Sequence, residues 1–460
     1  MNKGVVQLIC SSVTKNIEYP FLQGENSKSY GSGFMFCKDR KYILTCSHCI
    51  EDVVHIYVQI PKYGKKNFEA KVLSFCHNYD IALLEILDFK DTTISYLELN
   101  SNGMKDTNAG DKVEVLGYPL GQNNLKMTQG IVSGHQMSLY QIDSPINGGN
   151  SGGPLLRDGK VIGIISSGIL FANDIGYAVP IERFLNIYDL MKEKKVINPP
   201  EYFGFSIQKN PERNKNNSYI YNIMNNSLVA KSKPKIKKGD ILLKLGNYKV
   251  DFKETVEHKW MYENESFKDF LLRYKIGSEI PFQVQRGSKK INGKIPVFEI
   301  KPRIYELIHP YDIYEYCMIG GIVIVPVSIS VLKKSILKLC GTLIDCSSID
   351  ECHESITSIL DFFTRLEAKN QDNILTIINI LGGSSGDEYF SKGDFIDKVN
   401  GKNISSIKNL VQIIYKNKET TITVETNLGK KCIFSRKDII SENEKMKKQY
   451  EFNDFFKCKK

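Results

Sequence analysis

The sequence lacks an apolar run long enough to cross a membrane. Its longest run, MIGGIVIVPV at 318–327, is far shorter than the roughly 20 residues that a spanning helix needs, and it is typical of a buried strand. The N-terminus, MNKGVVQLICSSVTKN, has neither the apolar core of a signal peptide nor the arginine-rich character of a transit peptide. These absences predict an intracellular, cytoplasmic location and no membrane partner.

A block of charge of one sign is also missing. The net charge is +10 over 460 residues, and the lysines are scattered among asparagine and isoleucine. A solvated surface explains this pattern, and we expect no nucleic-acid partner. The 11 cysteines are odd in number and irregular in spacing, which favours reduced thiols over a disulfide framework. The length allows two to four domains with large cores.

Residues 1–190 are rich in short β-type runs. Segments such as GSGFMFC, KYILTCS, DIALLEI and KVIGIIS are separated by glycine, asparagine and aspartate. Many short strands at this spacing predict a barrel or a pair of barrels. The pattern changes at 181–194, where IERFLNIYDLMKEK has apolar residues at helical spacing after Pro180. We expect this helix to close the first domain, before a linker at Pro199-Pro200.

The second half of the chain contains a weak internal repeat. KKGDILLKLGNYKV at 237–250 aligns with SKGDFIDKVNGKNI at 391–404. Each copy has Lys-Gly-Asp, an apolar strand, a Gly/Asn turn and a second strand. The repeat predicts two similar small domains. The last 20 residues, 441–460, are polar and predict a helical or frayed tail.

The stretch SPINGGNSGGPLL at 144–156 places one hydroxyl, Ser151, among four glycines. A turn needs only one or two residues free of side-chain clashes. A serine becomes a nucleophile when it has a base, an orienting carboxylate and backbone N–H groups aimed at the developing oxyanion. Glycines let the chain turn those N–H groups into one pocket. The predicted oxyanion hole is Gly149, Asn150 and Ser151.

The sequence offers one base and one carboxylate in suitable positions. His48, in YILTCSHCIEDV, follows an apolar strand, whereas His55 and His135 lie in strand-like segments typical of structural histidines. Asp80, in HNYDIALLEI, stands at the mouth of a strand that we expect to be buried. Taken singly, His48 and Asp80 fit ordinary surface and turn positions. Together with Ser151, in the order His, Asp, Ser, they predict the triad of chymotrypsin-type proteases.

These segments resemble the HtrA/Deg (protease Do-like) serine peptidases. GSGFMFCKDRKYILTCSHCI is similar to the GSGF…ILTNAHVV segment of that family, YDIALLEI to its aspartate strand, and SPINGGNSGGPLL to its INPGNSGGPLL loop. The resemblance implies a chymotrypsin-like double β-barrel protease domain over 1–196. In it, His48 would be the general base, Asp80 its orienting partner and Ser151 the nucleophile.

The chain departs from the family pattern beside the histidine and in the serine loop. Cys46-Ser47 replaces the usual Asn-Ala before His48, and Cys49 follows it. In the serine loop, Gly148 replaces the usual proline. The C-x-x-C spacing also raises the alternative of a metal site. Zinc would need four ligands and would compete for His48. We therefore expect buried thiols and no metal or cofactor.

The C-terminal half resembles the PDZ domains of plant-type Do-like proteases, which carry two such domains and lack a membrane anchor. VINPPEYFGFSIQKNPERNK and KIKKGDILLKLGNYKVD are similar to the first, and HPYDIYEYCMIGGIVIVPVS to the start of the second. The predicted fold is mostly β, with α+β PDZ-like domains at 201–300 and 304–440 and a polar tail at 441–460. Because a PDZ groove holds a peptide C-terminus with loop N–H groups, the resemblance implies peptide contacts at Phe203, Gly204, Phe205, Gly320 and Gly321.

The resemblance implies a serine endopeptidase of protein quality control. It would cleave unfolded or damaged polypeptides through an acyl-enzyme, bind peptide C-termini at its PDZ domains, and form homo-oligomers of three or multiples of three. The alternative is a latent protease that acts mainly as a PDZ-based peptide-binding or chaperone-like assembly.

Overall fold

The computed structural model describes residues 4–13, 16–22, 24–39, 41–102, 106–136, 139–168, 175–200, 202–209, 218–225, 227–257, 264–299, 314–328, 374–416 and 419–458. The expected boundary between the two PDZ-like domains, at 300–304, lies outside these ranges. The chain divides into two compact units, one of residues 1–11 and 28–301 and one of residues 12–27 and 302–460. In the described ranges, no helix is both long and apolar enough to span a membrane.

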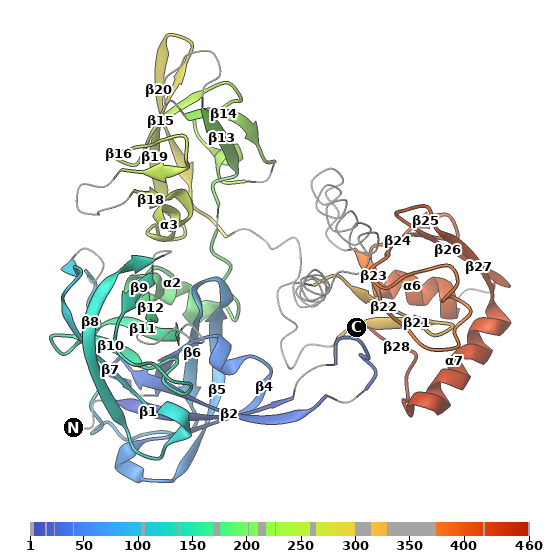
Figure 1. Ribbon diagram of the computed structural model, residues 1–460, viewed down its shortest axis with the longest axis horizontal. Helices are drawn as coiled ribbons and strands as arrows, with labels where there is room; N and C mark the ends of the chain where they lie inside the picture. The colour runs from blue at the N-terminus through green and yellow to red at the C-terminus, as the bar shows by residue number, and fades with distance from the viewer. Residues whose placement is uncertain are drawn as a thin grey trace. The chain divides into compact units, whose positions relative to one another are not determined.

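Six strands close the first barrel, in the order β1-β2-β3-β6-β5-β4 (Figure 1). Its interior is filled by aliphatic side chains of the short β-type runs, such as Ile43 and Leu84. Strand β3 pairs antiparallel with β6, so that Thr45 lies opposite Ala82. The residues that follow β3 and those that precede β6 therefore meet at one end of the barrel. The strands are β1 (Val5–Val13), β2 (Asn26–Met35), β3 (Tyr42–Thr45), β4 (Val53–Gln59), β5 (Asn67–Cys76) and β6 (Ile81–Ile86).

Six further strands close a second barrel, in the order β10-β11-β12-β9-β8-β7. The predicted pair of barrels is confirmed. Helix α2 (Ile181–Glu193) follows β12, and its buried Phe184 and Ile187 pack in a core cluster that takes residues from both barrels. It ends one residue earlier than its sequence pattern predicts. The strands are β7 (Lys112–Gly117), β8 (Lys126–Gln136), β9 (Leu139–Ile142), β10 (Pro154–Arg157), β11 (Lys160–Gly168) and β12 (Gly176–Pro180).

A small α+β domain follows within the first unit. Its sheet has the order β13-β14-β15-β19-β20, with β16 paired to β15. Helix α3 (Phe267–Leu272) is capped by Ser266, whose side chain accepts a hydrogen bond from the Asp269 amide. The strands are β13 (Phe205–Lys209), β14 (Ser218–Ile223), β15 (Ile241–Leu245), β16 (Tyr248–Lys249), β17 (Thr255–Val256), β18 (Glu265–Ser266), β19 (Glu279–Arg286) and β20 (Lys289–Pro296).

The second unit is built on a sheet of order β27-β26-β24-β23-β22-β21-β28, with β25 paired to β24. Residues 441–460 do not form a free tail, because α7 (Arg436–Tyr450) buries Asn443 and Met446 and β28 pairs with β21. The described part of this unit also contains helix α6 (Ile407–Val411) and a π-helical turn (Gln412–Lys416). The strands are β21 (Tyr316–Ile319), β22 (Ile322–Pro326), β23 (Leu375–Ile380), β24 (Phe395–Val399), β25 (Lys402–Asn403), β26 (Thr421–Thr426), β27 (Lys431–Ser435) and β28 (Phe456–Lys457).

The two copies of the sequence repeat form equivalent hairpins, β15–β16 and β24–β25. The aspartate of each Lys-Gly-Asp is buried, Asp240 at 1% exposure and Asp394 at 4%. Each carboxylate accepts a 2.8 Å hydrogen bond from an amide three residues earlier, of Lys237 and Ser391 respectively. Each also meets a cation, Arg286 and Lys430 respectively. The repeat is therefore a shared turn closed by a buried ion pair.

The connection between β1 and β2 belongs to the second unit. The ring of Phe21 lies 4.4 Å from that of Phe452, centroid to centroid. The Tyr314 hydroxyl donates to the carbonyl oxygen of Ile17 at 3.3 Å. Residues 16–22 thus pack against aromatic side chains of the second unit, such as Tyr314 and Phe452. The sequence patterns gave no indication of this contact.

Candidate active site

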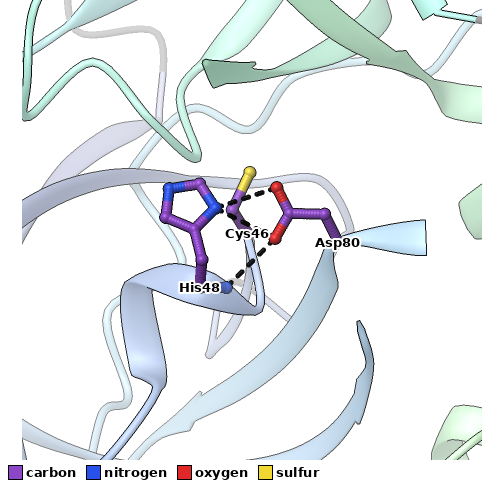
Figure 2. A group of neighbouring side chains, drawn as sticks. All are labelled: Cys46, His48 and Asp80. Carbon is purple, nitrogen blue, oxygen red and sulfur yellow. Dashed lines mark hydrogen bonds and ion pairs between the residues drawn. The ribbon is translucent and has the colours of Figure 1, made fainter. Parts of the chain in front are cut away.

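His48 and Asp80 meet at one end of the first barrel. His48 begins a 3-10 turn three residues after β3, and Asp80 stands immediately before β6. The antiparallel pairing of β3 with β6 brings these positions together. His48 Nδ1 lies 2.9 Å from Asp80 Oδ2 and 3.0 Å from Oδ1, and Figure 2 shows the imidazole facing the carboxylate. This bond orients the ring and leaves Nε2 as the nitrogen that faces away from Asp80.

Asp80 is held by further donors. Its Oδ1 accepts hydrogen bonds from the His48 amide at 3.0 Å and from the Ser47 hydroxyl at 3.1 Å. Its Oδ2 accepts a 2.6 Å bond from the hydroxyl of Ser166, on β11 of the second barrel. Burial alone would raise the pKa of Asp80, but the bonds from His48 and Ser166 hold it below its ordinary value. The carboxylate therefore remains ionised beside the imidazole.

Three glycines around Ser151 are required by close packing. A Cβ on Gly149 would lie 2.4 Å from the Tyr118 carbonyl oxygen, and one on Gly152 would lie 2.1 Å from Thr45 Oγ1. A Cβ on Gly153 would meet a main-chain oxygen of β7 at 2.3 Å. Gly149 and Gly152 also have positive φ angles, of 96° and 83°. The loop thus passes between the two barrels, and the neighbouring atoms leave no room for a side chain at these three positions.

Ser32 of β2 fastens this loop to the first barrel. Its amide donates to the Ser151 carbonyl oxygen at 2.9 Å, and its hydroxyl donates to the Gly149 carbonyl oxygen at 2.6 Å. The same hydroxyl accepts from the Tyr118 amide at 2.9 Å. Sequence reasoning assigned no role to Ser32, although it lies in the GSGF segment that is similar to the family pattern, and none to Ser166, which lies in a β-type run.

The amides of Gly149 and Ser151 are the better candidates for the oxyanion hole. In the described part of the chain, neither has a hydrogen-bond acceptor. The amide of Asn150 donates to the Asn147 carbonyl oxygen at 3.0 Å. A turn within the loop therefore uses the Asn150 amide, and a third N–H donor at Asn150 stays a prediction.

The Ser151 hydroxyl has a main-chain acceptor on β11 of the second barrel. Its Oγ donates a 2.9 Å hydrogen bond to the carbonyl oxygen of Ser166. Among the hydrogen bonds of the described residues, none joins Ser151 to His48. The structure places both residues at the junction of the two barrels, since Ser166 contacts Ser151 through its carbonyl oxygen and Asp80 through its hydroxyl. Transfer of the hydroxyl proton to Nε2 would require Ser151 Oγ to exchange this bond to Ser166 for one to His48.

Cys49 occupies the side of the imidazole that faces away from Asp80. Its Sγ lies 3.7 Å from His48 Nε2. Burial lowers the pKa of His48, but the hydrogen bonds to Asp80 and Cys49 outweigh it and raise the pKa to about 10. A hydrogen bond with Cys46 lowers the pKa of Cys49 to about 6, with His48 adding to the effect against burial. The site at rest therefore favours an imidazolium between a carboxylate and a thiolate.

Cys46, His48 and Asp80 have ligand-type atoms within 4.8 Å of one another (Figure 2). These atoms already have partners, because Cys46 Sγ donates to the Ile165 carbonyl oxygen at 3.1 Å and His48 binds Asp80. Burial raises the pKa of Cys46 well above its ordinary value, which disfavours the thiolate that a metal needs. The group fits an orienting pair with a buried thiol better than a metal centre.

The predicted contacts of the first PDZ-like domain lie at the start of β13, which is an edge strand of its sheet. Gly204 has a φ angle of 88°, and a Cβ there would lie 1.9 Å from that of Ser227. The rings of Phe203 and Phe205 meet that of Phe267, the first residue of α3, at 6.0 and 5.7 Å. A strand edge beside a helix is what a PDZ groove uses. Peptide binding here stays a prediction.

The predicted contacts of the second PDZ-like domain are placed differently. Gly320 and Gly321 form the tip of the hairpin between β21 and β22, and β22 pairs with strands on both sides. A Cβ on Gly320 would lie 2.6 Å from Glu442 Oε2, on α7. The chain itself therefore covers this tip, and peptide binding there also stays a prediction.

Comparisons with known proteins agree with this architecture. Residues 31–164 match the family of trypsin-like peptidase domains, and residues 309–454 match the PDZ domain family. Two similar proteins from Arabidopsis thaliana are protease Do-like 4, mitochondrial, and putative protease Do-like 3, mitochondrial. The first is 27% identical to this chain over a match that covers 73% of this chain and 67% of the relative. The second is 26% identical over a match that covers 89% of this chain and 71% of the relative.

Among solved structures, the serine endoprotease from Yersinia pestis is 22% identical, with a TM-score of 0.45 over 65% of this chain and 95% of its own.

The cytoplasmic location expected from the sequence is wrong, because the two Arabidopsis relatives are named as mitochondrial proteins. The expectation depended on the residue pattern of the first 16 positions, and that pattern does not define a compartment.

Proposed function

Because this chain is a serine endopeptidase related to the Do-like (HtrA/Deg) proteases, we propose that His48, Asp80 and Ser151 are its catalytic triad. The observation that carries the proposal is the bond of 2.9 Å between His48 Nδ1 and Asp80 Oδ2. It lies next to a serine loop that Ser32 ties to the same barrel. Side chains from three distant segments thus share the junction of two barrels.

In the proposed cycle, the Ser151 hydroxyl rotates toward His48 and attacks the scissile carbonyl carbon. His48 Nε2 takes the hydroxyl proton and then returns it to the leaving amine, while Asp80 stabilises the imidazolium. The amides of Gly149 and Ser151 donate to the oxyanion. Water, activated by the same imidazole, then hydrolyses the acyl-enzyme.

We propose unfolded or damaged polypeptides as substrates, because an extended segment can bring its peptide bond to Ser151 and a folded domain cannot. Digestion of casein by the purified chain, with a stably folded protein as a second substrate, tests this function. We expect wild type to degrade casein and to leave the folded protein intact. Ser151→Ala should be inactive on both. Digestion of casein by the Ser151→Ala variant would show that Ser151 is not the nucleophile.

The alternative, a latent protease that binds peptides, is favoured by one observation, the bond from Ser151 Oγ to the Ser166 carbonyl oxygen. A latent enzyme should leave casein intact until a peptide ligand reorders the loop. Casein digestion with and without added C-terminal peptides separates the two readings. Activity without added peptide supports the constitutive protease.

We also propose that the chain forms homo-oligomers, which sizing of the purified chain would test.

A further inference from the structure

Cys49 lies where chemistry at its sulfur would reach the proposed base. Its Sγ is 3.7 Å from His48 Nε2, the atom that must accept the Ser151 proton, and 3.6 Å from the Ser151 carbonyl oxygen. A Cβ built on Gly31 would lie 3.4 Å from the same sulfur. The thiol therefore stands between the imidazole, the serine loop and β2. Its residue is partly exposed.

The surroundings of Cys49 favour the reactive form of the thiol. His48 places a cationic ring beside the sulfur, and the lowered pKa of Cys49, about 6, keeps most of it as thiolate at neutral pH. The neighbouring Cys46 is fully buried, and burial raises its pKa. The two cysteines thus differ in both access and reactivity, and Cys49 is the one that external reagents should modify.

We propose that Cys49 is a site of reversible thiol modification by low-molecular-weight disulfides, and that this modification switches the peptidase off. The inhibitory part rests on the proposed role of His48. In the step, the Cys49 thiolate attacks one sulfur of the disulfide. A bond forms between Sγ and that sulfur, the original S–S bond breaks, and the second sulfur leaves as a thiolate. Cys49 is oxidised and the small disulfide is reduced.

Modification would inhibit by occupying space that the reaction needs. Because Nε2 lies on one side of the sulfur and the Ser151 backbone on the other, an adduct on Sγ adds bulk beside both groups. Ser151 Oγ already has another hydrogen-bond acceptor, the Ser166 carbonyl oxygen. A group between them prevents proton transfer, and general-base catalysis contributes about 10²–10⁴-fold to such reactions.

Oxidised glutathione is the probe for the experiment. We expect wild type to lose peptidase activity by about 10²-fold or more when Cys49 is fully modified, and to recover it with dithiothreitol. Cys49→Val, which carries the residue found at this position in the family pattern, should keep its own untreated activity in oxidised glutathione. Cys37→Ser removes another partly exposed thiol and should remain as sensitive as wild type.

A second measurement keeps the result interpretable if Cys49→Val has little activity. Peptide mapping of wild type by mass spectrometry gives the fraction of Cys49 that carries glutathione, and this fraction should match the fraction of activity lost. Full modification of Cys49 with unchanged activity would overturn the proposal, as would inhibition with Cys49 unmodified. Absence of peptidase activity before treatment would instead contradict the proposed function.

Discussion

The hydroxyl of Ser32 donates a 2.6 Å hydrogen bond to the carbonyl oxygen of Gly149. The same hydroxyl accepts a bond from the Tyr118 amide at 2.9 Å, and Ser32 is fully buried. One side chain of the first barrel therefore satisfies two main-chain groups of the second. The position of the serine loop depends on this contact between barrels.

Ser32→Ala should lower both stability and activity. The substitution leaves a buried carbonyl and a buried amide without a partner, which costs about 1–3 kcal/mol. Urea denaturation measures the free energy of unfolding, and casein digestion measures kcat. Ser29→Ala, on the exposed part of the same strand, is the matched control and should change neither. Equal values for the two variants would show that the Ser32 hydroxyl does not hold the loop.

Two glycines of the serine loop should respond differently to alanine. Gly152 has a φ angle of 83°, and a Cβ there would lie 2.1 Å from Thr45 Oγ1 and 2.2 Å from the Ser32 carbonyl oxygen. Gly148 has no heavy atom within 4 Å of its Cβ position. We expect Gly152→Ala to abolish proteolysis and Gly148→Ala to keep near wild-type activity. Comparable casein digestion by both variants would contradict the packing argument.

The pH dependence of kcat/KM should follow the protonation of His48. Its pKa is raised from 6.5 to about 10 in the folded chain. The stability that protonated His48 contributes is therefore complete below pH 6.5 and lost as the pH rises through 10. Catalysis needs the neutral imidazole, so kcat/KM should rise over the same window. Cys49→Val removes one of the contacts that raise this pKa and should move the rising limb to lower pH.

Profiles of kcat/KM from pH 6 to 10.5 for wild type and Cys49→Val would check this. Thermal unfolding at each pH serves as a control for loss of folded protein. A wild-type limb centred near the ordinary histidine value of about 6.5 would mean that Cys49 and Asp80 do not hold the proton on His48 in solution.

Phe21 should stabilise the second unit although it lies near the N-terminus of the chain. Its ring packs on Phe452 at 4.4 Å and on Tyr316 at 6.2 Å. Phe21→Ala removes partly buried aromatic area and should lower the free energy of unfolding of this unit by about 1–3 kcal/mol. Hydrogen exchange of β21 amides measures the effect. Tyr389→Ala, at an exposed ring of the same unit, should leave exchange unchanged.

Local patterns in the sequence predicted a barrel or a pair of barrels and the closing helix, and they singled out His48, Asp80 and Ser151, whose role as a triad stays a proposal. The short apolar runs specify strands, and the glycines around Ser151 mark a loop that passes close to backbone. The pairing of His48 with Asp80 could be expected because their segments flank strands of one barrel. The resemblance to Do-like proteases strengthened each of these predictions.

Contacts between distant segments could not be predicted in this way. Ser166 lies in an ordinary strand pattern, and only the barrel closure brings its hydroxyl to Asp80. The polar 441–460 segment has few apolar residues, yet β21 offers it a strand edge and a core contact for Met446. The amide of Asn150 is used by a turn that no residue pattern specifies. Each of these depends on tertiary geometry.

The proposed activity depends on one step, in which His48 and Asp80 make the Ser151 hydroxyl nucleophilic. A fluorophosphonate probe tests it directly, because it reacts with an activated serine and intact mass reports the adduct. We predict one adduct on wild type, located at Ser151 by peptide mapping, and labelling slowed by about 10⁴-fold or more in His48→Ala. Equal labelling rates for wild type and His48→Ala, or an adduct on Ser151→Ala, would contradict the account.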